Sequence, residues 1–200
     1  MSGDMLNIAV LGSGRGSNFQ TILAAIQQGR IPNARIAVVI SNNSGAGILE
    51  IARNNSLPAV HLSHRQFPTE DEFVDALLSL LRVHGVNFIV LAGYMKRIHP
   101  RVIEAYRRRI INIHPALLPR HGGKGMYGDK VHQAVIADGD KETGITIHFV
   151  NDHYDEGEII FQDSFEIQPV DTAETIAQKV HQLEYKHFPR VVEEVISSAY

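Results

Sequence analysis

Cysteine and tryptophan are absent from the 200-residue sequence, and aromatic residues make up only 7% of it. The absence of cysteine excludes a disulfide framework, thiolate zinc sites, iron–sulfur ligation and a cysteine nucleophile. So few aromatic residues suit neither a base-stacking surface for nucleic acid nor an aromatic belt in a membrane. No apolar run approaches about 18 residues, so no membrane-spanning segment is predicted.

The sequence also has no large excess of positive or negative charge. Lysine and arginine number 19 against 22 acidic residues, for a net charge of −3, which favours neither a nucleic-acid partner nor an anionic membrane surface. Residues 1–4 lack the basic segment of a signal peptide, so a cytoplasmic location is expected. With 44% hydrophobic residues, the chain has the composition of a globular protein. Its length predicts a single domain over residues 1–200, with an N-terminal half (5–110) and a C-terminal half (111–200).

Short apolar runs alternate with helical patterns through the N-terminal half. Five runs read as buried strands: Asn7–Leu11, Arg35–Ile40, Ala59–Leu62, Phe88–Ala92 and Ile110–Ile113. The intervening helices are expected from Phe19 to Ile26, over Gly47–Asn54 and over Thr69–Val83. Buried strands separated by helices indicate βαβ units, and hence an α/β fold with one doubly wound, mostly parallel sheet.

The C-terminal half has a different pattern. Two strands, Ile145–Val150 and Ile159–Phe165, lie close enough in the sequence to predict an antiparallel hairpin. A glycine-rich loop is expected over Arg120–Asp129, and a long final helix over Thr172–Ser198. For the start of that helix, Asp171 with Glu174 makes a better capping box than Thr172 with Thr175.

The loop after the first strand carries the first candidate site. Gly16, Ser17 and Asn18 complete a Gly-x-Gly-x-Gly-Ser-Asn sequence that opens a helix, and backbone N–H groups there can bind an anion. The loop lacks the lysine of a phosphate-binding P-loop and the glycine spacing of a dinucleotide fingerprint. A phosphate ligand is therefore predicted, and a Cβ at Gly16 would obstruct its approach. The alternative is a tight strand-to-helix turn that binds nothing.

A second candidate site is the pair Asn112 and His114 at the end of a predicted strand. Side chains two positions apart on a strand share one face, and ligands of open α/β sheets bind at the carboxyl ends of strands. An asparagine amide can donate to an oxyanion, and a histidine can move a proton. The alternative is an asparagine that caps a turn beside an exposed histidine.

Two acidic features admit opposed interpretations. The segment Asn151–Gly157 is either a solvated hairpin loop or part of a metal site with His148, but its spacing matches no standard ligand set, and no metal is predicted. Glu184 lies beside the apolar face of the last helix. Its carboxylate either reaches water or binds a ligand, because acids are rarely buried unpaired.

The order of these motifs resembles the formyl-folate transferase superfamily, and within it the phosphoribosylglycinamide formyltransferases. The resemblance covers about residues 7–195 and rests on LGSGRGSN, LAGYMKRIHP, NIHPALLP, ITIHFVNDHYDEG and LEYKHFP. Methionyl-tRNA formyltransferases and formyltetrahydrofolate hydrolases share some of these motifs, but each carries a further domain, at the C-terminus and the N-terminus respectively.

The resemblance implies residue roles by motif position. Catalysis is assigned to Asn112, His114 and Asp155, and binding of the phosphoribosyl substrate to Gly16, Ser17, Asn18 and Glu184. The folate-binding positions are Met95, Lys96, Arg97, Ile98, Asn112, Asn151, Asp152, His153, Tyr154 and Asp155. The resemblance also implies 10-formyltetrahydrofolate as co-substrate, phosphoribosylglycinamide as acceptor, and a monomer or homodimer.

The catalytic trio is Asn112, His114 and Asp155, and the chemistry expected of it is direct attack of the substrate amine on the formyl carbon. Asn112 would donate to the developing oxyanion, and His114, as imidazolium, would stabilise it and mediate proton transfer. Asp155 is expected to raise the pKa of His114 above its usual value of about 6.5. Two alternatives remain open: hydrolysis of the formylfolate by water, and a binding domain that has lost turnover.

Overall fold

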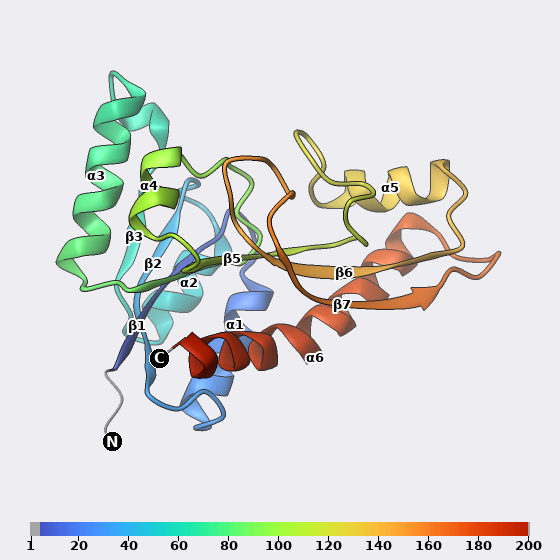
Figure 1. Ribbon diagram of the computed structural model, residues 1–200, viewed down its shortest axis with the longest axis horizontal. Helices are drawn as coiled ribbons and strands as arrows, with labels where there is room; N and C mark the ends of the chain where they lie inside the picture. The colour runs from blue at the N-terminus through green and yellow to red at the C-terminus, as the bar shows by residue number, and fades with distance from the viewer. Residues whose placement is uncertain (1–4, 200) are drawn as a thin grey trace.

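The computed structural model describes residues 5–199, which form a seven-stranded sheet with helices on both faces (Figure 1). The strand order is β3-β2-β1-β4-β5-β6-β7; β1 to β5 pair in parallel, whereas β6 pairs antiparallel with β5 and with β7. The strands are β1 (Leu6–Leu11), β2 (Ala34–Ser41), β3 (Ala59–His61), β4 (Phe88–Leu91), β5 (Ile110–His114), β6 (Glu142–Phe149) and β7 (Ile159–Glu166). The predicted fold class, including the antiparallel hairpin and the long final helix, is confirmed.

Apolar runs become strands here because both faces of the sheet are covered. The helices are α1 (Ser17–Gln27), α2 (Gly47–Asn54), α3 (Glu70–Val83), α4 (Pro100–Ala105), α5 (Asp129–Ala137) and α6 (Ala173–Ala199), with a short 3₁₀ turn η1 (His64–Gln66). Helices α1, α2, α5 and α6 share one buried cluster with the sheet, and α3 and α4 share the other. Such two-sided burial suits continuous runs of Val, Ile and Leu.

The sheet reverses its winding between β1 and β4. From β1 the chain runs outward through β2 to β3, and it then returns to the other side of β1 with β4 and β5. The loops that follow β1 and β4 therefore diverge from adjacent strand ends, which opens a crevice where ligands of such sheets bind. Ser13 joins the two loops: its Oγ accepts the Met95 N–H at 2.9 Å and donates to Asn42 Oδ1.

Two details of the helices differ from the sequence expectation. Helices α4 and α5 were not expected, because α4 is only six residues long and α5 begins directly after the glycine-rich loop. At the start of α6 the capping box forms between Thr172 and Thr175, whose side chains each accept the other residue's backbone N–H, at 2.9 and 3.3 Å. The preference for Asp171 with Glu174 was wrong, because the Asp171 carboxylate is held by Lys179 at 2.6 Å.

Candidate active site

Strand β5 presents Asn112 and His114 at its carboxyl end, beside the antiparallel strand β6. The register places Asn112 opposite His148 and His114 opposite Thr146. His114 is 3% exposed and Asn112 is half-buried, so neither side chain is a surface feature. The interpretation of an exposed histidine beside a capping asparagine is therefore wrong.

The hydrogen bonding of His114 fixes which ring nitrogen carries a hydrogen. Its Nε2 lies 2.8 Å from the carbonyl oxygen of His121, and a carbonyl can only accept, so Nε2 is the donor. The other nitrogen, Nδ1, faces Asp155 Oδ2 at 3.6 Å. In the neutral ring, Nδ1 is thus the free proton acceptor, and it is oriented toward a carboxylate.

Burial sets the charge of His114. It lowers the pKa of His114 below its ordinary value, and this effect outweighs the Asp155 carboxylate and the His121 carbonyl, which both raise it. The expectation of a raised pKa was wrong: the carboxylate acts in the expected direction, but loss of water around a ring that is 3% exposed acts more strongly. Near neutral pH, His114 is therefore predominantly neutral.

His148 orients the amide of Asn112. The Nδ1 of His148 lies 2.9 Å from the carbonyl oxygen of Phe149, so it carries a hydrogen, and Nε2 accepts from Asn112 Nδ2 at 3.1 Å. One of the two N–H bonds of the Asn112 amide is used in this way, which leaves the second free for a ligand. The sequence showed His148 on a strand but did not show that it faces Asn112.

Asp155 lies in the loop between β6 and β7 and meets both histidines. Its Oδ1 is 3.7 Å from His148 Nε2, and its Oδ2 accepts the Gly123 N–H at 2.9 Å. Burial by itself would raise the pKa of Asp155, but the two histidines and the Gly123 N–H outweigh it, and the pKa is below its ordinary value. Asp155 is thus an ionised, largely buried carboxylate and not a solvated loop acid.

The loop is pressed against the sheet at Gly157. A Cβ built on Gly157 would lie 1.6 Å from the carbonyl oxygen of Phe149, so no larger residue fits without a shift of the loop. The Phe149 N–H also donates to Glu158 O at 2.9 Å. This close approach fixes the path of the segment that carries Asp155.

The loop between β1 and α1, which ends at Gly16, has the geometry of an anion site. Gly16 occupies the N-cap with φ of 86°, contributes no capping side chain, and no acidic residue lies in the first turn. The first N–H groups of α1 are therefore available to a ligand. Gly16 also has a packing role that the sequence did not show: a Cβ there would lie 2.7 Å from Ile48 Cα in α2, so the glycine is required whether or not a phosphate binds.

Asn18 in the first turn of α1 contacts Glu184 in α6. Asn18 Nδ2 donates to Glu184 Oε2 at 3.0 Å, and Glu184 is only 5% exposed, so the interpretation of a carboxylate that reaches water was wrong. The buried Oδ1 of Asn18 has no hydrogen-bond donor among residues 5–199. His181, which the sequence did not single out, also contacts Glu184 Oε2 at 3.0 Å through Nδ1, and this contact raises its pKa.

A small cavity of about 60 Å³ opens beside the trio and contains most of the predicted folate positions. Its walls combine apolar groups from Leu91, Ile98 and Val150 with polar groups. The folate positions that line it are Lys96, Arg97, Ile98, Asn112, Asn151, His153, Tyr154 and Asp155. Met95 and Asp152 lie outside its wall: Met95 is 45% exposed and meets Ser13 through its backbone.

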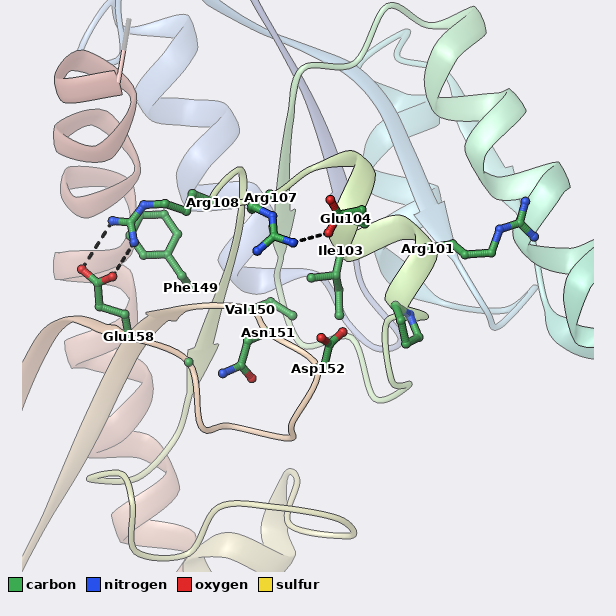
Figure 2. A pocket seen from close by; sticks show the side chains of 12 residues that line it. Arg101, Ile103, Glu104, Arg107, Arg108, Phe149, Val150, Asn151, Asp152 and Glu158 are labelled. Atoms are coloured by element: carbon green, nitrogen blue, oxygen red, sulfur yellow. Dashed lines mark hydrogen bonds and ion pairs between the residues drawn. The ribbon is translucent and has the colours of Figure 1, made fainter.

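A larger cavity of about 470 Å³ lies along the same loop but does not reach the trio (Figure 2). It runs between α4 and the ends of β6 and β7, and Asp152 is in its wall. Figure 2 shows Arg108 paired with Glu158 and stacked on Phe149, its guanidinium 4.6 Å from the ring centroid. Its wall contains three arginines and three acidic residues, so this cavity has no strong net charge.

No group of three or more His, Asp or Glu side chains in the described range 5–199 is placed to hold a metal ion. The four residues of the metal alternative, His148, Asp152, His153 and Asp155, do not converge in that way. In the same range, no helix is long and apolar enough to cross a bilayer.

The fold and site place this chain in the class of open α/β proteins with a candidate site at the topological switch point, where α1 starts without a side-chain cap and β5 ends in an Asn–His–Asp cluster. Within that class, the chain belongs to the formyl transferase family, whose model matches residues 6–192. The resemblance drawn from the sequence motifs is thereby confirmed for the family.

Named relatives are similar over most of this chain. The phosphoribosylglycinamide formyltransferase of Bacillus subtilis is 38% identical over 96% of this chain and 95% of its own length. The chloroplastic phosphoribosylglycinamide formyltransferases of Arabidopsis thaliana and Vigna unguiculata are 41% and 42% identical over 92% and 93% of this chain, which spans only 63% and 59% of their lengths. The crystal structure of the Bacillus halodurans phosphoribosylglycinamide formyltransferase superposes with a TM-score of 0.90 at 31% identity and 97% coverage of both chains.

Proposed function

We propose that the chain transfers the formyl group of 10-formyltetrahydrofolate to the primary amine of phosphoribosylglycinamide, a step of purine biosynthesis. The observation that carries the proposal is the convergence of Asn112, His114 and Asp155. Glu184, which accepts from Asn18 in the first turn of α1, also acts electrostatically on His114 and links this cluster to the helix start. Relatives named for this activity, similar over at least 92% of the chain, support it. We further propose that residues 1–200 act as one formyltransferase domain, with the phosphate loop in residues 5–110 and the catalytic trio in 111–200.

The phosphoribosyl substrate would bind across α1 and α6. Its phosphate would accept from N–H groups at Gly16, Ser17 and Asn18, where the positive end of the helix favours negative charge. The Asn18 Oδ1, buried without a donor among residues 5–199, would accept from the substrate's amine or a ribose hydroxyl. Glu184 is buried beside it and supplies a carboxylate for the same groups.

The walls of the cavity beside the trio have the chemistry that a folate ring requires. A flat heteroaromatic ring has apolar faces and polar edges, and the walls offer both kinds of group. Ile98 and Val150 would cover the ring faces, while the segment Asn151–Asp155 presents polar groups to the ring edge. Burial raises the pKa of Tyr94 in this wall to about 12, so its phenol remains an uncharged donor at neutral pH.

Asn112 would stabilise the charge that develops during attack. When the amine bonds to the formyl carbon, the formyl oxygen gains negative charge, and the free N–H of Asn112 can donate to it. Because His148 holds the other N–H in place, the donor is oriented before the reaction starts. An oriented donor of this kind contributes about 2.7–4 kcal/mol of transition-state stabilisation.

His114 would move the proton that the reaction must relocate. The amine loses one proton as the new C–N bond forms, and the folate nitrogen gains one as its bond to the formyl carbon breaks. Neutral His114 can accept the first proton at Nδ1 and return it to the leaving nitrogen. Asp155, 3.6 Å from Nδ1, stabilises the imidazolium that exists between the two transfers. This assignment replaces the resting imidazolium expected from the sequence, because burial keeps His114 neutral.

The test is consumption of 10-formyltetrahydrofolate by the purified chain, with and without phosphoribosylglycinamide. The proposal requires rapid consumption only when the amine is present, with formylated product in equal amount. Consumption at the same rate without the amine identifies a hydrolase, and no consumption under either condition identifies a binding domain.

A further inference from the structure

The loop from Leu118 to Gly123 contributes two backbone groups to the catalytic pair. The carbonyl oxygen of His121 accepts from His114 Nε2 at 2.8 Å, and the Gly123 N–H donates to Asp155 Oδ2 at 2.9 Å. One loop therefore contacts both members of the pair that handles the proton. A shift of this loop would alter the orientation of His114 and Asp155 together.

The loop conformation is not one that its sequence favours by itself. His121 has φ of 54°, in the left-handed region that non-glycine residues disfavour. Its neighbour Gly122 packs so closely that a Cβ would lie 2.6 Å from Leu118 Cδ2 and 3.2 Å from Asp155 Cβ. Such a conformation persists where surrounding contacts hold it.

Asp140 makes those contacts from outside the active site. It lies in the turn between α5 and β6, where its N–H donates to Val135 O at 3.2 Å. Its carboxylate is only 5% exposed; Oδ2 lies 2.7 Å from His121 Nε2, and Oδ1 pairs with Arg120. The side chains of two consecutive loop residues thus converge on one buried carboxylate.

We propose that Asp140 is a positioning residue: through His121 and Arg120 it fixes the loop whose His121 carbonyl and Gly123 amide hold His114 and Asp155. Asp140 touches neither the reacting atoms nor the substrate cavities described above. The inference rests on the proposed proton transfer by His114, and nothing in the sequence motifs assigns Asp140 or His121 a role.

The chain offers a matched control for this contact. Asp138 presents Oδ2 to the opposite nitrogen of the same ring, His121 Nδ1, at 3.8 Å, but its side chain is 61% exposed. Substitution of Asp138 removes an acid of equal charge from the same turn without disturbing the buried pair. A general effect of charge near α5 would lower kcat in both the Asp138 and the Asp140 variants, whereas loss of positioning would lower it only in the Asp140 variants.

The experiment compares Asp140→Ala, Asp140→Asn and Asp138→Ala with the parent chain. For Asp140→Ala we expect kcat to fall about ten- to a hundredfold, because small misplacements of catalytic groups cost that much, while KM for both substrates stays within about twofold. Asp140→Asn keeps the shape and one acceptor, so its loss should be smaller in the same direction. Asp138→Ala should keep kcat within about twofold of the parent.

A second readout separates positioning from loss of stability. The His121 carbonyl raises the pKa of His114, so displacement of the loop should lower the His114 titration midpoint measured by NMR. The other groups that act on His114 are Asp155, His148, Glu184 and His132, and none of them is substituted. If Asp140→Ala fails to fold, Asp140→Asn and His121→Phe must show the lowered kcat and the lowered midpoint.

Parental kcat in the Asp140 and His121 variants would overturn the inference, as would lowered kcat with an unchanged His114 midpoint. Failure of the proposed function has a different signature. In that case the parent chain itself shows no amine-dependent formyl transfer, while the His114 midpoint still reports whether Asp140 holds the loop.

Discussion

Replacement of Asn112 by alanine removes the group to which the structure assigns oxyanion stabilisation. We expect kcat for formyl transfer to fall about 10²–10³-fold, equivalent to about 2.7–4 kcal/mol, the range measured for the loss of one oriented donor. KM for phosphoribosylglycinamide should change little, because the proposed phosphate and amine contacts come from α1 and α6. The assay is steady-state kinetics at saturating concentrations of each substrate in turn.

The same substitution has a predictable effect on stability. It leaves His148 Nε2, on a ring that is 2% exposed, without the Asn112 donor, and an unsatisfied buried acceptor costs about 1–3 kcal/mol. A fall in Tm of several degrees is therefore expected, and assays belong well below that temperature. Asn54→Ala is the control, since this exposed amide at the end of α2 lines neither cavity. An Asn112→Ala enzyme that keeps more than about a third of the parental kcat would refute the oxyanion role.

Three further predictions address the charge of His114, the turn at Gly16 and the acid on α6. Because the pKa of His114 is lowered and its neutral form accepts the proton, kcat should rise with pH through a midpoint below about 6.5 and be level at neutral pH. Asp155→Asn should lower that midpoint and the NMR midpoint of His114, since the carboxylate raises this pKa; unchanged midpoints would exclude the coupling. Gly16→Ala should reduce the free energy of unfolding by more than about 2 kcal/mol in denaturant titrations, because of its positive φ and its overlap with Ile48. Glu184→Gln should raise KM for phosphoribosylglycinamide at least about tenfold and leave KM for the folate within about twofold; equal rises would show a structural effect.

The parts of the fold that could be predicted are those determined by short stretches of neighbouring residues. Continuous apolar runs flanked by helices identified all seven strands within one or two residues at their ends, apart from β6, which begins three residues earlier than expected. Helix α5 was missed because its start, Asp129, follows four glycines and gives little periodic signal before the turn at Gly139. In α3, which was predicted over Thr69–Val83 and begins one residue later, the buried residues are Val74, Leu77 and Leu81.

The site was predictable only in part. Alternation along β5 placed Asn112 and His114 on one face, which follows from local geometry. The partners of these residues come from pairings that the sequence does not encode locally: the antiparallel register sets His148 opposite Asn112, and a backbone carbonyl holds His114. The direction of the His114 pKa was misjudged for a related reason, because the carboxylate partner is visible in a motif but the degree of burial is not.

The most direct test of the proposed formyl transfer is the fate of the formyl carbon in a single turnover. The chain is mixed in excess with 10-formyltetrahydrofolate that carries ¹³C in the formyl group, with phosphoribosylglycinamide present, and the products are resolved by NMR. We expect the label in the formyl amide of the phosphoribosyl product, and we expect His114→Ala and Asn112→Ala to slow its appearance. Label that appears in free formate at the same rate, whether or not the amine is present, would contradict the proposed formyl transfer.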